Sequence, residues 1–364
     1  MGRRELLIAL AFVAVAVVAY QLTAPASPAS EGGAVGDLLA EFRREIRGNP
    51  GRGSFTHRGL IATPPGTAEL RPPAVNALTL IGEPRADIAY ELTVQSVAAD
   101  DGAARAAAEG AALAQDAFGS VLALRVTHPP QARSTSTMTV RVPARLAIRL
   151  EGVRRATISQ VGALHLEGFV GDAQVSEVAG AISGSHRNGT LTLAGAASVT
   201  LTLTGSRTTL SGIRGATSLT GRGGEIRLAD PAGAVDVNGT DLDVSIATPR
   251  GRVRIDASNG DVVVDRPAAG TEINGRRLKV TVTLAAAVPV TAATTEGSLT
   301  LLLDGPPAVT IDAAASEGAT IDASEFGVTA EPFDRGLRLT HRFGDEARVA
   351  LRNQRGAIVI GPVK

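Results

Sequence analysis

Aspartate recurs at short intervals in the second half of the chain, and closely spaced carboxylates can support two kinds of chemistry. Carboxylate oxygens are the ligands that Ca²⁺ prefers, and two facing carboxylates can act as acid and base in polysaccharide cleavage. The spacing suggests that these aspartates occupy neighbouring turns of a repeat and could form one exposed acidic row. The aspartates concerned are Asp236, Asp241, Asp243, Asp256, Asp261 and Asp265.

Arginines lie among these aspartates, so cross-strand ion pairing on a solvated face is the simpler interpretation. They are Arg250, Arg252, Arg254 and Arg266. The Gly-Gly-x-Gly-x-Asp nonapeptide of calcium-binding β-rolls is missing from the sequence. We therefore predict no catalytic residue, no metal site and no cofactor. As a candidate weak cation or ligand face we name Asp241, Asp243, Asp256 and Asp261.

The remaining chemical motifs favour structural roles. The five histidines show no i, i+4 or His-x-His pair. His165 and His186 lie about one repeat apart, and we interpret both as solvent-facing polar residues. The chain has no Cys, which excludes disulfides, thiolate metal sites and cysteine nucleophiles. Asn188-Gly-Thr and Asn238-Gly-Thr match the glycosylation acceptor, but we interpret both as turns.

The elements that must position these residues form a ladder of short phrases between about Val161 and Val264. Each phrase is a glycine followed by alternating aliphatic and polar residues, as in Gly251-Arg-Val-Arg-Ile-Asp and Gly260-Asp-Val-Val-Val-Asp. A period of two is typical of a half-buried strand. We predict that Val253, Ile255, Val262 and Val264 point inward, and we interpret the Asn-Gly pairs at Asn188, Asn238, Asn259 and Asn274 as tight turns.

No single phrase buries enough surface to be stable, but stacked copies share one core. The sequence therefore predicts an all-β fold, a β-solenoid or β-helix-like stack of short strands. Hydrophobic residues make up 44% of the chain and aromatic residues only 3%, so the core must consist of aliphatic side chains. A formal net charge of +0 removes the electrostatic case for a nucleic-acid partner.

The amino terminus predicts export. Arg3 and Arg4 precede an apolar run from Leu6 to about Leu22, followed by small residues and prolines. This is the pattern of a signal peptide, and the run also approaches the length of a membrane-spanning helix. Residues 1–30 are therefore a signal peptide or an N-terminal membrane anchor, two alternatives that the sequence leaves open.

Two further segments precede the ladder. Residues 31–59 are expected to be a linker with a short amphipathic helix, followed by loop and irregular strand over Gly51–Pro73. Residues 60–145 are expected to form a small mixed β unit that caps the stack. Its strands are predicted at Leu78–Ile81, Ile88–Val97, Val121–Val126 and Met138–Val142, with one helix that begins near Asp100 and runs through Ala103–Gln115.

Residues 146–361 are assigned to the solenoid domain. Its strands continue at Leu278–Leu284, Leu299–Leu303 and Val309–Ile311, and the coil register is least clear over Thr204–Arg222, where the phrases are looser. The final pair, Arg348–Arg352 and Ala357–Gly361, is expected to be the carboxy-terminal cap.

At three places the chain resembles the bacterial putative adhesin domain family. They are Asp87-Ile-Ala-Tyr-Glu-Leu-Thr-Val94 with the helix after it, the repeat beginning Gly-Arg-Val-Arg-Ile-Asp, and the ending Asn353-Gln-Arg-Gly-Ala-Ile-Val-Ile360. The resemblance covers about residues 60 to 361. It implies an exported β-solenoid of largely unknown function and supplies no catalytic residues.

Together these features predict a non-catalytic envelope protein that presents a repetitive surface for binding or adhesion to a protein, a glycan or a second copy of itself. The expected location is periplasmic or at the cell surface, with an inner-membrane anchor at residues 6–22 if the signal is retained. The alternative is a carbohydrate-active β-helix enzyme that uses carboxylates of the solenoid face. The absence of Trp and the scarcity of aromatic platforms weigh against this alternative.

Overall fold

The computed structural model describes residues 50–130, 132–305 and 307–363, which are mostly β-strand and form a long, largely parallel sheet. The predicted signal or anchor segment and the predicted amphipathic helix lie outside the described residues. None of the helices that the structure describes is long and apolar enough to span a bilayer. The chain divides into two compact units, a small one and a large one.

The small unit carries the single α-helix of the described chain, α3 (Asp101–Glu109). Its N-terminus is capped as predicted, because the Asp100 side chain accepts a hydrogen bond from the Ala103 amide at 2.8 Å. The helix ends earlier than the predicted Gln115. Gly110 closes it, and the next residues form strand β5 (Ala112–Phe118), which pairs antiparallel with β6 (Val121–Thr127). Local alanine content favoured helix, but hairpin pairing decides the conformation here.

The first strands of the described chain differ from the prediction in one respect. The segment expected to be loop and irregular strand forms β1 (Gly51–Ala62) and β2 (Glu69–Arg71). Pairing of β1 with β4 explains the difference, since a strand can be stabilised by its neighbour without an alternating pattern. The strands predicted at the other four places are confirmed: β3 (Ala77–Glu83), β4 (Asp87–Ala98), β6 and β7 (Arg133–Pro143).

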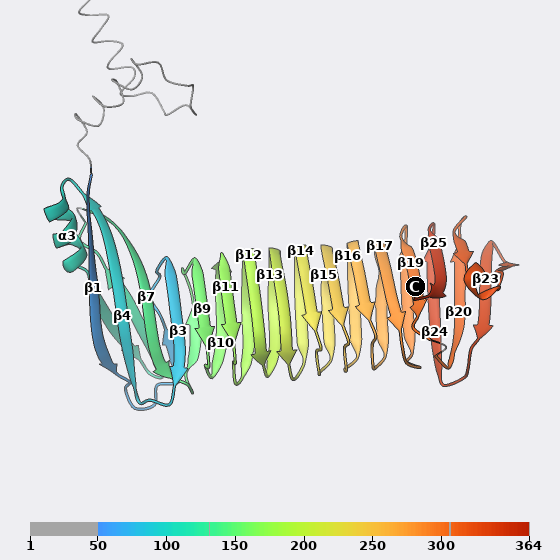
Figure 1. The fold of residues 1–364 in the computed structure, drawn as a ribbon, viewed down its shortest axis with the longest axis horizontal. Coiled ribbons are helices and arrows are strands. Elements are labelled where there is room, and N and C mark those ends of the chain that lie inside the picture. Colours follow the sequence, from blue (N-terminus) through green and yellow to red (C-terminus); the bar gives the residue numbers. More distant parts are fainter. Residues whose placement is uncertain (1–49, 131, 306, 364) are drawn as a thin grey trace, which may run out of the picture. The chain divides into compact units, whose positions relative to one another are not determined.

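The predicted ladder is a stack of parallel strands, seen in green to orange in Figure 1. Val235 lies opposite Val253 on the next strand, and side-chain contacts 18 residues apart recur along the stack. The register continues without a break through Thr204–Arg222, where the looser phrases left it unclear. The strands are β8 (Ala147–Leu150), β9 (Arg155–Ser159), β10 (Ala163–Val170), β11 (Asp172–Ser176), β12 (Ala181–Ala196), β13 (Ser198–Ile213), β14 (Thr217–Ala229), β15 (Val235–Ala247), β16 (Val253–Asp265) and β17 (Thr271–Leu284).

The inward register is confirmed, because Val253, Ile255, Val262 and Val264 are each 0% exposed. The corners of the stack recur at the same interval as the strands. Positive φ angles occur at Asp241, Asn259 and Arg277, which occupy the same place in successive repeats. One such corner per repeat bends each long strand between two faces of the stack.

The predicted turn at Asn-Gly is therefore correct at Asn188 and Asn259 and wrong at Asn238 and Asn274. Asn238 and Asn274 lie inside β15 and β17, on either side of Asp256 in the ladder. The glycines that follow them have a packing role instead. A Cβ on Gly239 or Gly275 would lie 2.4 or 2.5 Å from a methyl carbon of Leu242 or Leu278, so glycine makes room for these inward leucines.

The carboxy-terminal strands correct the predicted cap. The remaining elements are β18 (Val290–Thr295), β19 (Ser298–Leu303), β20 (Val309–Ser316), β21 (Thr320–Asp322), the 3₁₀ turn η1 (Ser324–Phe326), β22 (Glu331–Phe333), β23 (Gly336–Arg342), β24 (Ala347–Gln354) and β25 (Ala357–Pro362). Strand β24 lies between β18 and β20, and β25 lies between β19 and β21. The last strands of the chain are thus inserted into the stack, and the segment from β20 to β23 forms its end (Figure 1).

Candidate functional site

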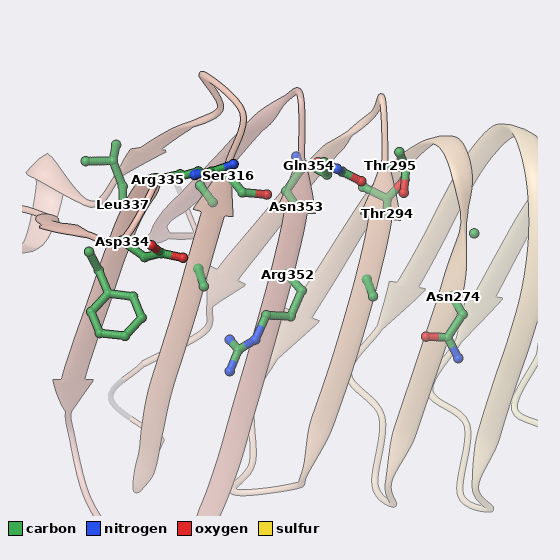
Figure 2. A pocket seen from close by; sticks show the side chains of 16 residues that line it. Asn274, Thr294, Thr295, Ser316, Asp334, Arg335, Leu337, Arg352, Asn353 and Gln354 are labelled. Carbon is green, nitrogen blue, oxygen red and sulfur yellow. The ribbon is translucent and has the colours of Figure 1, made fainter.

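A groove of about 680 Å³ lies at the carboxy-terminal end of the large unit, and we call it the C-terminal groove. Figure 2 shows Arg352 projecting from the middle of its strand, with Asn274 to one side of it and the turn between β22 and β23 to the other. The groove is lined by residues 274–275, 293–295, 314–316, 333–337 and 352–354.

Parallel pairing brings these residues together from distant parts of the sequence. Four residues stand opposite one another on neighbouring strands: Asn274 on β17, Ala293 on β18, Arg352 on β24 and Ala314 on β20. The two alanines flank the long Arg352 side chain, so the sheet surface is low on both sides of it. The groove exists because β24 is inserted between β18 and β20.

A buried carboxylate holds the inserted strand beside this groove. The side chain of Asp312 on β20 is only 3% exposed and pairs with Arg338 at 3.3 Å, Arg348 at 2.6 Å and Arg352 at 3.0 Å. Burial acts to raise the pKa of the Asp312 carboxyl, but hydrogen bonds from Arg348 and Arg352 and the nearby positive charges lower it overall. We call these four residues the Asp312 cluster. It joins β20, β23 and β24.

The rim at the strand ends is also ion-paired. Arg355 bridges Glu296 at 3.4 Å and Glu317 at 2.5 Å, and Arg276 approaches Glu296 at 3.5 Å. Hydrogen bonds from Arg355 and Gln354 lower the pKa of Glu317, so its carboxylate stays ionised at neutral pH. These charges satisfy one another across neighbouring strands.

Other polar groups that line the groove are free. Within the described part of the chain, the side chains of Asp334, Arg335, Thr295 and Ser316 make no hydrogen bond or ion pair. Asp334 and Arg335 form the tip of the β22–β23 hairpin, where Asp334 has a positive φ of 52°. The adjacent Phe333 is 57% exposed, and the Arg338 guanidinium lies 5.2 Å from its ring centroid. The hairpin tip thus presents unpaired charge and an aromatic ring together.

The four aspartates of the predicted cation or ligand face do not form one row. Asp256 lies on the first half of β16 and pairs with Arg254 at 2.8 Å. Asp241 occupies a corner and accepts a hydrogen bond from Asn259 Nδ2 at 3.0 Å. Asp243 and Asp261 are brought together on successive strands, where the Asp261 amide donates to Asp243 Oδ1 at 3.1 Å.

A cation or ligand role for these aspartates stays a prediction. Among residues 50–130, 132–305 and 307–363, no group of three or more His, Asp or Glu side chains is arranged to hold a metal ion. None of the four aspartates lines the C-terminal groove. Sequence reasoning missed this groove, because its residues come from six strands with no shared motif.

One histidine prediction is wrong. His186 is fully buried, stacks on Phe169 with ring centroids 5.7 Å apart, and donates from Nε2 to the Gly171 carbonyl at 2.8 Å. Burial lowers its pKa, outweighing the opposite effects of that hydrogen bond and of Asp172. The aromatic Phe169 one repeat earlier was the available signal for an inward position. His165 is half-buried and lies 3.0 Å from the Ser183 hydroxyl, so the two histidines do not meet.

Comparisons with known proteins find matches among solved structures only. No protein family and no curated protein matches the chain. It matches in structure a putative adhesin from Parabacteroides distasonis with 9% identity and a TM-score of 0.31, over 87% of this chain and 98% of that one. A putative adhesin from Parabacteroides merdae has 10% identity and a TM-score of 0.26, over 86% and 97% of the two chains. A putative cell adhesion protein from Clostridium sporogenes has 10% identity and a TM-score of 0.18, over 85% and 100%. The predicted resemblance to bacterial putative adhesins is thus found among solved structures.

Proposed function

We propose that this protein is a non-catalytic, exported binding module whose stacked strands form a β-solenoid, with the C-terminal groove as its binding face. The observation that carries the proposal is that a groove of about 680 Å³ brings free polar side chains together with an exposed aromatic ring. Within the described residues, the side chains of Asp334 and Arg335 at this groove have no partner in the chain. Free polar groups beside an exposed aromatic ring are available to a partner at no cost to the fold.

The proposed organisation follows the sequence. Residues 1–30 would export or anchor the chain, 31–59 link it to the fold, 60–145 form the amino-terminal β unit and 146–361 form the solenoid. The proposed location is the envelope, periplasmic or at the surface.

The function can be tested with the purified full chain coupled to beads and mixed with envelope fragments of the producing cell. We expect retention of the fragments by the wild type and loss of retention with Phe333→Ala combined with Arg335→Ala. The matched control combines Phe118→Ala with Arg227→Ala. Phe118 is 67% exposed, and Arg227 lies on β14, away from the groove residues in the ladder. Absence of retention by the wild type, or equal retention by both variants, would refute the proposal.

The same preparation tests the non-catalytic assignment. Because Asp243 and Asp261 stand side by side on one face, they are the pair that a glycosidase would need. We expect no new reducing ends when the full chain is incubated with envelope polysaccharide. Release of reducing ends that disappears with Asp243→Asn or Asp261→Asn would establish the enzyme alternative instead.

A further inference from the structure

We propose that the C-terminal groove binds a segment of an uncharged polysaccharide. This inference rests on the proposed binding function and adds the chemical class of the ligand. It follows from the balance of free donors and acceptors, from the local charge, and from the apolar surfaces between the polar groups.

The free polar groups at the groove are of both hydrogen-bonding kinds. The Arg335 guanidinium can only donate and the Asp334 carboxylate can only accept, while the Thr295 and Ser316 hydroxyls can do either. A sugar hydroxyl also donates and accepts, so a polyol can satisfy all four groups. A polyanion would bring negative charge against the Asp334 carboxylate, which repels it. A polycation would meet Arg335.

The charges around the groove are balanced, which also favours an uncharged ligand. Five arginines lie at this end of the sheet: Arg335, the three of the Asp312 cluster, and Arg342, which pairs with Asp345. Glu331 stands opposite Arg338 in the register, and Glu346 lines a neighbouring hollow with Arg348. With Asp312, Asp334 and Asp345, these give five carboxylates for five arginines. Such a surface has no excess field to attract a charged polymer.

Apolar surface lies between the polar groups, as a sugar ring requires. Ala293 and Ala314 line the groove on either side of Arg352, and Phe333 lies at its end with more than half of its surface exposed. The C–H faces of a pyranose ring pack against such surfaces while its hydroxyls point sideways to polar partners. A mixture of apolar walls and a few polar groups that fix orientation is typical of small-molecule sites.

The dimensions suit a short stretch of a linear chain. The groove crosses β17, β18, β24, β20 and the start of β23 (Figure 2), and neighbouring strands lie about 4.8 Å apart, so it extends over roughly 19 Å. A chain lying across the strands would pass Asn274 first, then Arg352, and finally the hairpin tip with Phe333, Asp334 and Arg335.

The first test is direct binding of defined oligosaccharides to the full chain, measured by isothermal titration calorimetry. The uncharged probes are β-1,4-linked hexamers of glucose and mannose, and the acidic probe is hexagalacturonate. We expect at least one uncharged hexamer to bind. Phe333→Ala and Arg335→Ala should each weaken that binding by about tenfold, equivalent to about 1.4 kcal/mol. Phe118→Ala and Arg227→Ala are the matched controls and should leave it unchanged.

The second test separates the ligand class from the binding function. Envelope fragments are treated with periodate, which cleaves vicinal diols of sugars, or with proteinase, and are then offered to the bead-bound chain. We expect periodate to abolish retention and proteinase to spare it. Retention that survives periodate but not proteinase would overturn the glycan while leaving the binding function in place. Preferential binding of hexagalacturonate would overturn the uncharged class, and so would failure of every hexamer to bind at about 10 mM. Hexamer binding that the groove variants do not alter would overturn the site.

Discussion

Arg352 on β24 and Asp312 on β20 join two strands that are 40 residues apart in the sequence, with Nη2 and Oδ2 separated by 3.0 Å. The same arginine donates from Nη1 to the Asp312 backbone carbonyl at 2.7 Å. A side chain from the inserted strand therefore binds both the carboxylate and the main chain of its neighbour. These contacts explain how strands from the end of the chain are held inside the stack.

Replacing Asp312 by Asn should destabilise the protein by about 2–3 kcal/mol. Breaking a fully buried ion pair costs about 3–5 kcal/mol, but the arginines here are about half exposed and can be partly hydrated. The measurement is the free energy of unfolding in urea. Asp256→Asn, which disrupts an exposed pair with Arg254, is the control and should change stability by less than about 0.5 kcal/mol. Equal effects of the two substitutions would show that the Asp312 cluster does not stabilise the insertion.

The pH dependence of Asp312 follows from its lowered pKa. A carboxyl with a folded pKa below its unfolded value of about 3.9 contributes stability above that value and loses the contribution as pH falls through the folded pKa. The stability difference between wild type and Asp312→Asn should therefore be full near pH 7 and shrink below about pH 4. Urea titrations at several pH values measure it. A difference that stays constant down to the lowest measurable pH would contradict the assignment.

His186 should make stability fall between pH 7 and pH 5. Its pKa is lowered by burial, so in this range the unfolded chain, with a histidine pKa of about 6.5, binds the proton more readily than the folded one. The stabilising effect of neutral pH is thus lost as pH falls below about 6.5, and the loss levels off below the folded pKa. His186→Leu should flatten this part of the profile, because Leu203 occupies the equivalent position on the next strand. His165→Leu, at a half-buried position, serves as the comparison.

The inward register predicts a large difference between two nearby positions. Val264 is fully buried, so Val264→Asp would place an unpaired charge in the aliphatic core and should cost several kcal/mol. Val263, its neighbour on the opposite face, is 38% exposed, and Val263→Asp should cost much less. Thermal and urea unfolding of the two variants would compare them. Similar losses at both positions would mean that the register is wrong.

The insertion of β24 and β25 predicts an unusual response to truncation. Deleting residues 345–364 removes partners from β18 and β19 on one side and from β20 and β21 on the other. Amide exchange should therefore accelerate on both sides of the deleted strands, as far back as Val290. If β20 and β23 kept their protection in the truncated chain, the strand order described above would be incorrect.

Several features of the fold were predictable because they depend on neighbours in the sequence. Alternation of aliphatic and polar residues is local, so the inward side of Val253 and Ile255 could be predicted from the phrase that contains them. The cap at Asp100 was predictable for the same reason. The positions of the corners were less predictable from the sequence. Each long strand bends once per repeat, and the bends lie at Asp241 and Arg277, where φ is positive. The Asn-Gly pairs at Asn238 and Asn274 therefore stay extended.

The site was not predictable in this way. The groove forms where four residues lie opposite one another, because a parallel sheet can pair strands without regard to their order in the chain. They are Asn274, Ala293, Arg352 and Ala314. Backbone hydrogen bonds between strands carry little information about which strand is the partner, and the aliphatic pattern of β24 suits any position in the stack. The sequence by itself determined a stacked, half-buried ladder and the direction of its side chains. Only the tertiary structure decided that the last strands enter the stack early, because that choice depends on non-local partners such as Asp312 for Arg348 and Arg352.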